Sequence, residues 1–173
     1  STSPPAARSD PVPPVPYRGA VPCLACGRPG GPVCPRCRPS LARPPDRALG
    51  GGVVATGAWS HRGAARALVH RCKYDGIGVV AALAAAWLEP PSGVSALVPV
   101  PRVVVRRIVH GIDPSRALAE ALAARWGLPV VDALAVAWWA PRRAGRRLRP
   151  APPSFRARAM VPGAVIVDDV VTT

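Results

Sequence analysis

The sequence predicts an α/β fold with a mostly parallel sheet and flanking helices, preceded by a small cysteine-rich module. Short apolar runs rich in valine alternate with longer segments whose apolar residues recur every three or four positions. This alternation is typical of strands joined by crossover helices. Four of the five cysteines lie ahead of it, within CLACGRPGGPVCPRC at residues 23–37.

Three segments follow from composition. Residues 1–22 are rich in proline and lack periodicity, so we expect a disordered arm. Residues 23–50 form the cysteine module and a Pro/Arg linker, and residues 51–173 form the α/β domain. The 173-residue chain shows no signal segment and no apolar run of spanning length, which favours a cytoplasmic protein without a membrane span. We expect the domain to be C-terminally incomplete, because the chain stops inside a motif.

The first half of the domain predicts one strand and two helices. GVVATGAW, residues 52–59, is bounded by glycines and predicts a strand. Residues 61–74 predict a helix with Ala65, Leu68, Val69 and Cys72 on its apolar face. Residues 78–88 predict a second helix that stops before two prolines.

The second half predicts three strands and a helix. VSALVPVP, residues 94–101, predicts a buried strand, and residues 128–139 predict another strand. Residues 164–170 predict a last strand that is buried on both faces. Asp113 and Pro114 provide an N-cap and a first helical residue for a helix that Gly127 closes. Residues 141–158 carry seven arginines and too many prolines for a regular element.

The four clustered cysteines predict a structural zinc site. Cys23 and Cys26 form one CxxC pair, and Cys34 and Cys37 form the second. Each pair curls the backbone so that two thiolates face one point, and four thiolates satisfy tetrahedral Zn²⁺ without an open position. A pair of disulfides or an iron–sulfur cluster is the alternative. Cys72 lies apart on a helix face and is expected in the core, not as a nucleophile.

The formal net charge is +14, which indicates either a solvated basic surface or a polyanionic partner. Aromatic residues are too sparse for a base-stacking platform. The arginine run in residues 142–149 contains no acid and is the first candidate for contact with a nucleic-acid backbone. Its candidate contact residues are Arg142, Arg143, Arg146 and Arg147.

The last strand ends in two adjacent acids, Asp168 and Asp169, followed within three residues by Thr172 and Thr173. Ligands of open α/β sheets bind at the carboxyl ends of the strands. Adjacent carboxylates can accept hydrogen bonds from a ribose diol or ligate a metal, and the threonines can begin a phosphate-binding loop. The alternative is a solvated loop in which the acids cap a helix.

The pattern VIVDDVVTT resembles the phosphoribosyl-pyrophosphate signature of type I phosphoribosyltransferases. From about residue 23 onward, the chain resembles the ComF family, which joins a zinc ribbon to such a domain and is linked to competence for DNA uptake. The resemblance also rests on LVHRCKYDG (68–76), LVPVP (97–101) and RRIVHGIDPSRALAEALA (from Arg106), in the family's order.

The resemblance implies roles for individual residues. Asp168 and Asp169 would bind the ribose hydroxyls of phosphoribosyl pyrophosphate, together with Mg²⁺, and would be the catalytic residues. The other ligand-binding positions would be Thr172 and Thr173 at the 5′-phosphate, Pro101 and Arg102 at the pyrophosphate, and Lys73 with Tyr74. A snorkelling surface position is the alternative for Lys73.

The sequence departs from the family in two stretches. Residues 110–114 read HGIDP in place of an Arg-Gly-Phe-Asn-Gln-like stretch, and the family's glutamine before the arginine-rich segment is missing. Nothing in the sequence identifies the acceptor. Three hypotheses therefore remain: a phosphoribosyltransferase or sugar-phosphate-binding protein; a non-catalytic accessory protein that binds single-stranded DNA and DNA-uptake proteins; and a zinc-ribbon interaction module.

Overall fold

A short parallel sheet forms the centre of the α/β half of the molecule. The computed structural model of the chain describes residues 21–103, 108, 111–136 and 155–170. Strand β3 (Ala96–Pro99) is buried at every position and pairs in parallel with β6 (Ala164–Val167). On its other side, Leu97 forms a parallel bridge to Val130. The apolar run at 94–101 therefore forms the buried strand that its sequence predicts.

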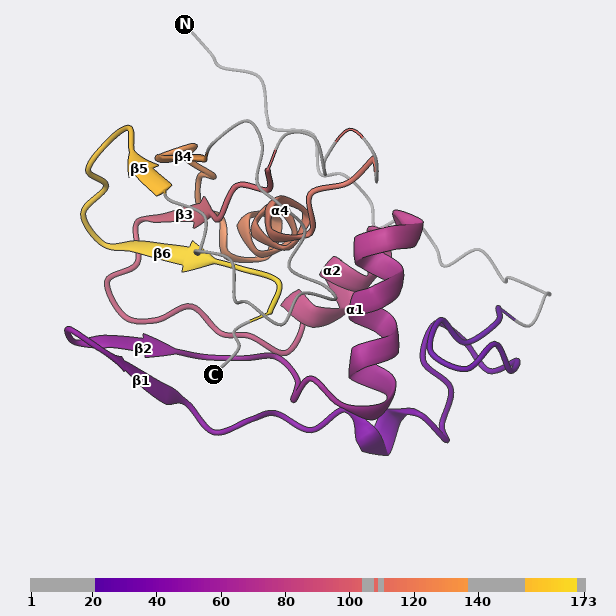
Figure 1. Cartoon of the computed structure of the whole chain (residues 1–173). Coiled ribbons are helices and arrows are strands. Elements are labelled where there is room, and N and C mark those ends of the chain that lie inside the picture. The colour runs from indigo at the N-terminus through magenta and orange to yellow at the C-terminus, as the bar shows by residue number, and fades with distance from the viewer. Residues whose placement is uncertain (1–20, 104–107, 109–110, 137–154, 171–173) are drawn as a thin grey trace, which may run out of the picture.

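One helix packs on this sheet, and a second helix packs against the first. Helix α4 (Pro114–Trp126) has Asp113 as its N-cap and ends at Gly127 in the left-handed conformation, as the sequence predicts. Helix α2 (Val79–Ala85) is shorter than predicted and packs against α4. Ala119 and Leu122 of α4 join Leu97 and Val167 in one buried apolar cluster. Figure 1 shows α4 beside the strands, with α2 between it and α1.

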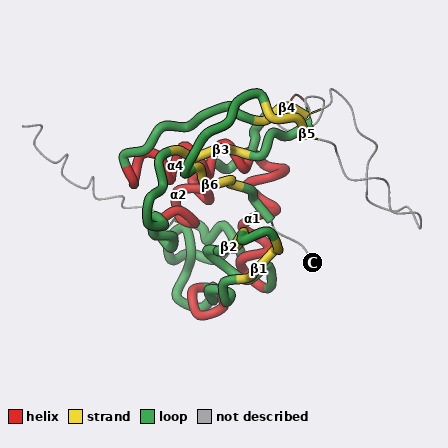
Figure 2. The backbone as a smooth tube through the Cα atoms, turned by 90° about the vertical axis from the view of Figure 1, so that its left-hand side faces the viewer, coloured by secondary structure: helices red, strands yellow, loops and turns green. Residues whose placement is uncertain are grey.

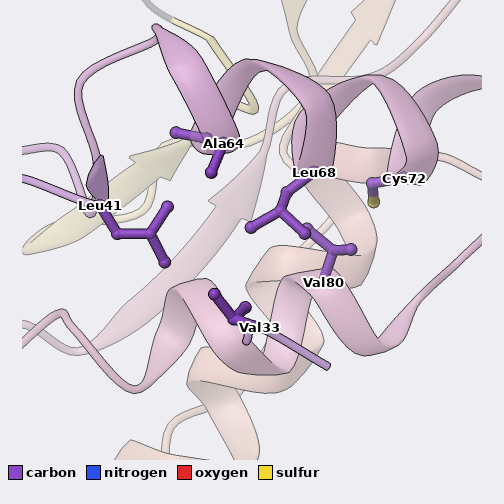
Figure 3. Packing of buried hydrophobic residues seen from close by; sticks show 7 residues of the cluster. Val33, Leu41, Ala64, Leu68, Cys72 and Val80 are labelled. Atoms are coloured by element: carbon purple, nitrogen blue, oxygen red, sulfur yellow. The ribbon is translucent and has the colours of Figure 1, made fainter. Parts of the chain in front are cut away.

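The cysteine module and helix α1 (Gly63–Asp75) share a second apolar cluster. Val33 and Leu41 flank the 3-10 helix η1 (Arg38–Ser40) and the second cysteine pair, and both pack with Leu68 of α1 and Val80 of α2. Figure 3 shows these side chains converging from the three segments. Cys72 is also in this cluster, only 4% exposed, which confirms its predicted core position. The module is therefore anchored on the α/β half by apolar packing.

The structure also has two antiparallel strand pairs among its described residues. The first is a hairpin of β1 (Arg47–Gly50) and β2 (Val53–Ala55), and the second joins β4 (Leu134–Val136) to β5 (Phe155–Ala157). The hairpin lies apart from the other strands in Figures 1 and 2. The described residues therefore form a mixed α/β fold in which one of the three strand pairs is parallel.

Some predictions about the strands were wrong. Strand β1 lies in the segment read as a linker, and β5 lies in the proline-rich stretch read as irregular. The strand predicted at 52–59 is an exposed three-residue hairpin strand, not part of the parallel sheet. The last strand was read as buried on both faces, yet Ile166 is 64% exposed, because nothing among the described residues covers that face.

Candidate functional site

The four clustered cysteines converge on one point. Turns at both CxxC pairs are closed by backbone hydrogen bonds, from Gly27 N to Cys23 O at 2.7 Å and from Cys37 N to Cys34 O at 2.9 Å. Gly27 has a φ of 76°, a left-handed conformation that glycine adopts without strain. All four Sγ atoms lie within 4.8 Å of one another, and none forms a disulfide. The disulfide alternative is therefore not realised.

The geometry and the donor set fit a tetrahedral metal ion such as zinc. A Zn–S bond of about 2.3 Å gives a tetrahedron whose sulfur–sulfur edge is about 3.8 Å. The Sγ atoms of Cys26 and Cys34 are 3.7 Å apart. Burial raises the pKa of Cys23, but N–H hydrogen bonds from Cys34, Cys26 and Ala25 outweigh burial and lower that pKa to about 6.

Cys37 is a thiol of this group whose ionisation is opposed by its surroundings. Its hydrogen bond with the Cys26 side chain, its burial and the nearby charge of Cys23 raise its pKa to about 12. Cys23 therefore ionises readily, whereas the charge of Cys23 opposes the ionisation of Cys37. A bound divalent cation would remove that opposition and hold all four thiolates together.

The acidic pair lies directly after β6, at the carboxyl end of the parallel sheet. The Oδ1 atom of Asp168 accepts hydrogen bonds from Ser115 Oγ at 2.9 Å and from Asp169 N at 2.8 Å. Among the described residues, nothing donates to its Oδ2. Burial raises the pKa of Asp168, while the Ser115 hydrogen bond and the Lys73 charge oppose that increase. Asp168 therefore has one fixed oxygen and one available oxygen.

Lys73 balances the second acid. Its Nζ atom lies 2.8 Å from Asp169 Oδ2, and the two side chains are 26% and 19% exposed. Burial lowers the pKa of Lys73, and the charge of Asp168 partly restores it. The lone lysine of the chain is thus an ion-pair partner of the acidic pair, which its sequence alone did not indicate.

Arg102 ties the surrounding loops together. Its guanidinium donates to the carbonyl oxygens of Lys73 at 3.2 Å and Ile112 at 3.0 Å. Its backbone N–H donates to Asp113 Oδ2 at 3.1 Å, while Asp113 Oδ1 accepts from Arg116 N and caps α4. These contacts join the end of α1, the segment after β3 and the start of α4 around the acidic pair.

The other predicted ligand positions lie near this end of the sheet or outside the described residues. Pro101 is half-buried in the segment that follows β3. Tyr74 is half-exposed and packs against His70, with the ring centroids 4.5 Å apart and the ring planes inclined at 45°. Two groups lie outside the described residues: Thr172 with Thr173, and the arginines Arg142, Arg143, Arg146 and Arg147.

A cavity of about 300 Å³ adjoins the acidic pair. Its walls come from α1, α2, α4 and the segment 56–61 after β2, and Asp168 and Asp169 line it. His61, whose side chain is exposed, also lines this cavity. Burial, then the charges of Lys73 and Arg66, lower the pKa of His61, which favours its neutral imidazole.

Sequence reasoning missed Ser115 and the second role of Asp113. Ser115 is only 5% exposed and lies on the same helical stripe as Ala119 and Leu122. A polar residue on an otherwise apolar stripe is a signal for a buried partner, and here that partner is Asp168. The hydrogen bond from Arg102 N to Asp113 Oδ2 joins two separate loops, so no local sequence pattern predicts it.

Within the described residues, the search for a helix long and apolar enough to cross a bilayer finds none. No protein-family model, curated protein or solved structure matches the chain, so its function rests on its own geometry.

Proposed function

We propose that the chain binds a phosphorylated ribose of the phosphoribosyl pyrophosphate class through Asp168 and Asp169, as a ComF-like protein with a type I phosphoribosyltransferase fold. The observation that carries the proposal is the position of the two acids. They follow a parallel strand at its carboxyl end, where α/β sheets bind ligands, and they line a cavity. The resemblance of VIVDDVVTT to the phosphoribosyl-pyrophosphate signature supports it.

The two carboxylates would accept hydrogen bonds from the 2′- and 3′-hydroxyls of the ribose. Asp168 offers Oδ2, because Ser115 and the Asp169 backbone already occupy its Oδ1. Asp169 offers Oδ1, because Lys73 holds its Oδ2. Ser115 and Lys73 therefore fix the directions in which the available oxygens point, and they leave one acceptor for each hydroxyl.

A transfer reaction at this site would replace pyrophosphate on the ribose. A lone pair of the acceptor forms a bond to the C1 carbon while the C1–O bond to pyrophosphate breaks, and pyrophosphate leaves with the bonding pair. Mg²⁺, bound with the substrate, would offset the charge that develops on pyrophosphate. The carboxylates of Asp168 and Asp169 would stabilise the cationic character of the sugar.

The cysteine module would be a structural zinc ribbon. Four thiolates leave no coordination position for water, so such an ion stabilises the fold and takes no part in the chemistry. Its attachment to α1 through Val33 and Leu41 supports this structural role.

The sugar-site proposal is tested by calorimetric titration of the protein with phosphoribosyl pyrophosphate and Mg²⁺. The double variant Asp168→Asn, Asp169→Asn should bind at least tenfold more weakly, because amides cannot supply the same charge-assisted acceptors. The matched control is Asp132→Asn, which removes a surface acid that pairs with Arg116. Equal affinity in the double variant and the control would remove the site assignment.

A second candidate function, contact with single-stranded nucleic acid, is favoured by the basic face of the cysteine module. Between residues 21 and 45 the charged side chains are all arginines, and Arg28 and Arg36 line a second cavity beside Gly63 of α1. Such a face binds phosphate backbones by releasing counterions and is independent of sequence. The protein would then act as an accessory in DNA uptake.

Fluorescence anisotropy of a labelled oligonucleotide tests this candidate. The logarithm of the affinity should fall with the logarithm of salt concentration, with a slope of roughly 0.7 per phosphate contact. Arg28→Ala with Arg36→Ala should lower that slope, as should alanine at the predicted contacts Arg142, Arg143, Arg146 and Arg147. Arg125→Ala provides the control, because Arg125 of α4 is exposed and pairs with Glu89. A slope near zero in the unmodified protein would exclude the candidate.

A further inference from the structure

We propose that Cys26 is a modification site, at which a peroxide oxidises the four-cysteine group, and that a disulfide between Cys26 and Cys34 then releases the metal ion. The inference rests on the proposed metal site and adds to it a reaction of the ligands themselves. It is separate from the sugar-site proposal, because the four cysteines do not line the cavity beside the acidic pair.

Solvent exposure distinguishes the four cysteines. Cys23 and Cys34 are buried, at 2% and 3% exposed, and Cys37 is half-buried. Cys26 is exposed. A thiolate reacts with a dissolved oxidant only where the oxidant reaches its sulfur atom, and buried structural cysteines are inert for this reason. Cys26 is therefore the ligand that a dissolved peroxide meets first.

The second cavity admits a small oxidant to Cys26. Cys26 and Cys37 line it from the cysteine module, and Ala64 and Ala67 of α1 also line it. Its volume is about 300 Å³. A water molecule occupies about 30 Å³ in the liquid, and hydrogen peroxide is only somewhat larger. The cavity can therefore hold a peroxide molecule beside the metal ligands.

Two arginines make this cavity electropositive. Arg28 and Arg36 line it, and its lining contains no acid. Within the described part of the chain, no ion pair neutralises either guanidinium. Positive charge beside an accessible cysteine favours the thiolate and is typical of cysteines that react with oxidants. Cys26 has both features, whereas Cys72 is buried in an apolar cluster.

Cys34 is positioned to complete a disulfide with Cys26. The two Sγ atoms are 3.7 Å apart, and a disulfide bond is about 2.05 Å long. The two sulfurs therefore need only a small movement to bond. Because Cys26 and Cys34 belong to different CxxC pairs, this bond would join the two turns of the module.

The reaction takes place in two steps. The Cys26 thiolate attacks one oxygen of hydrogen peroxide, the O–O bond breaks, and hydroxide leaves with the bonding pair. Cys26 is thereby oxidised to a sulfenic acid while the peroxide is reduced. The Cys34 thiolate then attacks the Cys26 sulfur, an S–S bond forms, the S–O bond breaks, and a second hydroxide leaves. Two thiolates and one peroxide thus give one disulfide and two hydroxide ions.

The disulfide would change the metal site and the packing beside it. It leaves two thiolates for the ion, which are too few for a closed structural site. Val33 and Leu41 of the module pack with Leu68 of α1, so loss of the ion should also loosen this packing. Oxidation at Cys26 should therefore lower the melting temperature of the protein.

A time course of oxidation tests the proposal. The zinc-loaded protein is treated with hydrogen peroxide, and zinc release is followed with a chromophoric chelator against a sample without peroxide. Samples are quenched, denatured and alkylated, and tandem mass spectrometry locates the oxidised cysteines. Cys26 and Cys34 should lose their thiols as fast as zinc appears, while Cys72 keeps its thiol. Oxidation that begins at another cysteine, or zinc that stays bound once Cys26 is oxidised, would overturn the proposal.

Two variants test the cavity and leave all four ligands in place. Ala67→Leu narrows the cavity, and Arg28→Ala with Arg36→Ala removes its positive charge, so each should slow the oxidation by about threefold or more. The matched controls are Ala82→Leu and Arg38→Ala, at exposed positions that do not line the cavity. All variants should keep the zinc content of the unmodified protein. Oxidation rates equal to those of the controls would overturn the role of the cavity.

Reversal identifies the product. Dithiothreitol with added zinc should restore the metal content and the original melting temperature, since thiols reduce a disulfide but not a sulfinic acid. Metal loss that this treatment does not reverse would overturn the disulfide as the product.

The metal site and the modification site fail separately. If the protein binds no zinc, the metal site and the release of the ion are lost, whereas first oxidation at Cys26 in the same assay still supports the modification site. A protein that binds zinc but is oxidised first at another cysteine retains the metal site and loses the modification site.

Discussion

At the scale of single residues, the acidic pair is an arrangement in which each carboxylate has one oxygen committed to the protein. Ser115 and the Asp169 backbone N–H hold one oxygen of Asp168, and Lys73 holds one oxygen of Asp169. This arrangement keeps two adjacent acids in place at the end of a strand. It also has a cost, because burial disfavours the charged form of Asp168.

Asp168→Asn should therefore increase the stability of the folded protein at neutral pH. Asparagine keeps an oxygen for Ser115 and for the Asp169 N–H but carries no charge. Because the folded-state pKa of Asp168 is raised, the native state binds more protons than the unfolded state between the two pKa values, and stability falls as pH rises through that range. The gain at pH 7 should be below about 1 kcal/mol, because solvent reaches Asp168.

Urea unfolding of the two proteins at several pH values measures this difference. The gain should shrink as the pH falls and should vanish below the ordinary aspartate pKa of about 3.9, where Asp168 is protonated in both states. A variant that is less stable than the unmodified protein at pH 7 would contradict the expectation. Asp132→Asn, at an exposed site, should show no such gain.

At the scale of elements, most helices were predictable because their signals are local. Asp113, Pro114 and Gly127 mark the ends of α4, and the structure confirms each of them. The strands were harder, because a strand of three or four residues carries little pattern. Arg47–Gly50 became a strand only by pairing with β2, and Phe155–Ala157 only by pairing with β4. Tertiary pairing decided these elements, not propensity.

Asp113→Ala should destabilise the protein by about 1 to 2 kcal/mol. The change removes the N-cap of α4 and also the acceptor for the Arg102 N–H. Asp113→Asn is the control, because asparagine keeps the shape of the side chain and one acceptor oxygen at the cap. Its loss of stability should be smaller. Chemical unfolding measures both, and equal stabilities of the alanine variant and the unmodified protein would argue against the tie between the two loops.

Gly163→Ala should cost about 1 to 3 kcal/mol at the entrance to β6. Gly163 has a φ of 67°, which strains any residue with a Cβ atom, and a Cβ atom there would lie 2.8 Å from the carbonyl oxygen of Gly93. The same substitution at Gly111 is the control, because its φ of 69° is similar but no atom of the described residues lies within 4 Å of the added Cβ. Thermal unfolding should show the larger loss at position 163, and equal losses would mean that strain alone, not the contact, sets the cost.

At the scale of the whole molecule, the cysteine module and the α/β half share one apolar cluster. Val33 and Leu41 of the module contact the cluster that contains Leu68 of α1 and Val80 of α2 (Figure 3). An ion that orders the module would therefore also order the packing against α1. The module is too small to bury a core of its own, so metal binding and folding should be coupled.

Removal of the metal should lower the melting temperature of the whole protein. A chelator should remove the bound ion and make unfolding less cooperative. Calorimetry follows the unfolding, and a chromophoric chelator measures the zinc. Cys26→Ser should act in the same way. Cys72→Ala is the control, since Cys72 lies outside the four-cysteine group and should leave the metal content unchanged. A melting temperature that does not change on metal loss would contradict the coupling.

The sequence by itself determined the features whose physics is local. The CxxC spacing brought four sulfurs together, the apolar run at 94–101 became the buried strand, and the caps of α4 follow from side chains next to the helix ends. Only the tertiary structure decided which residues surround the acidic pair. Lys73, Ser115 and Arg102 come from separate elements, and each reaches the site through long-range packing. The cavity has the same origin, since it is a gap between helices and no single segment encodes it.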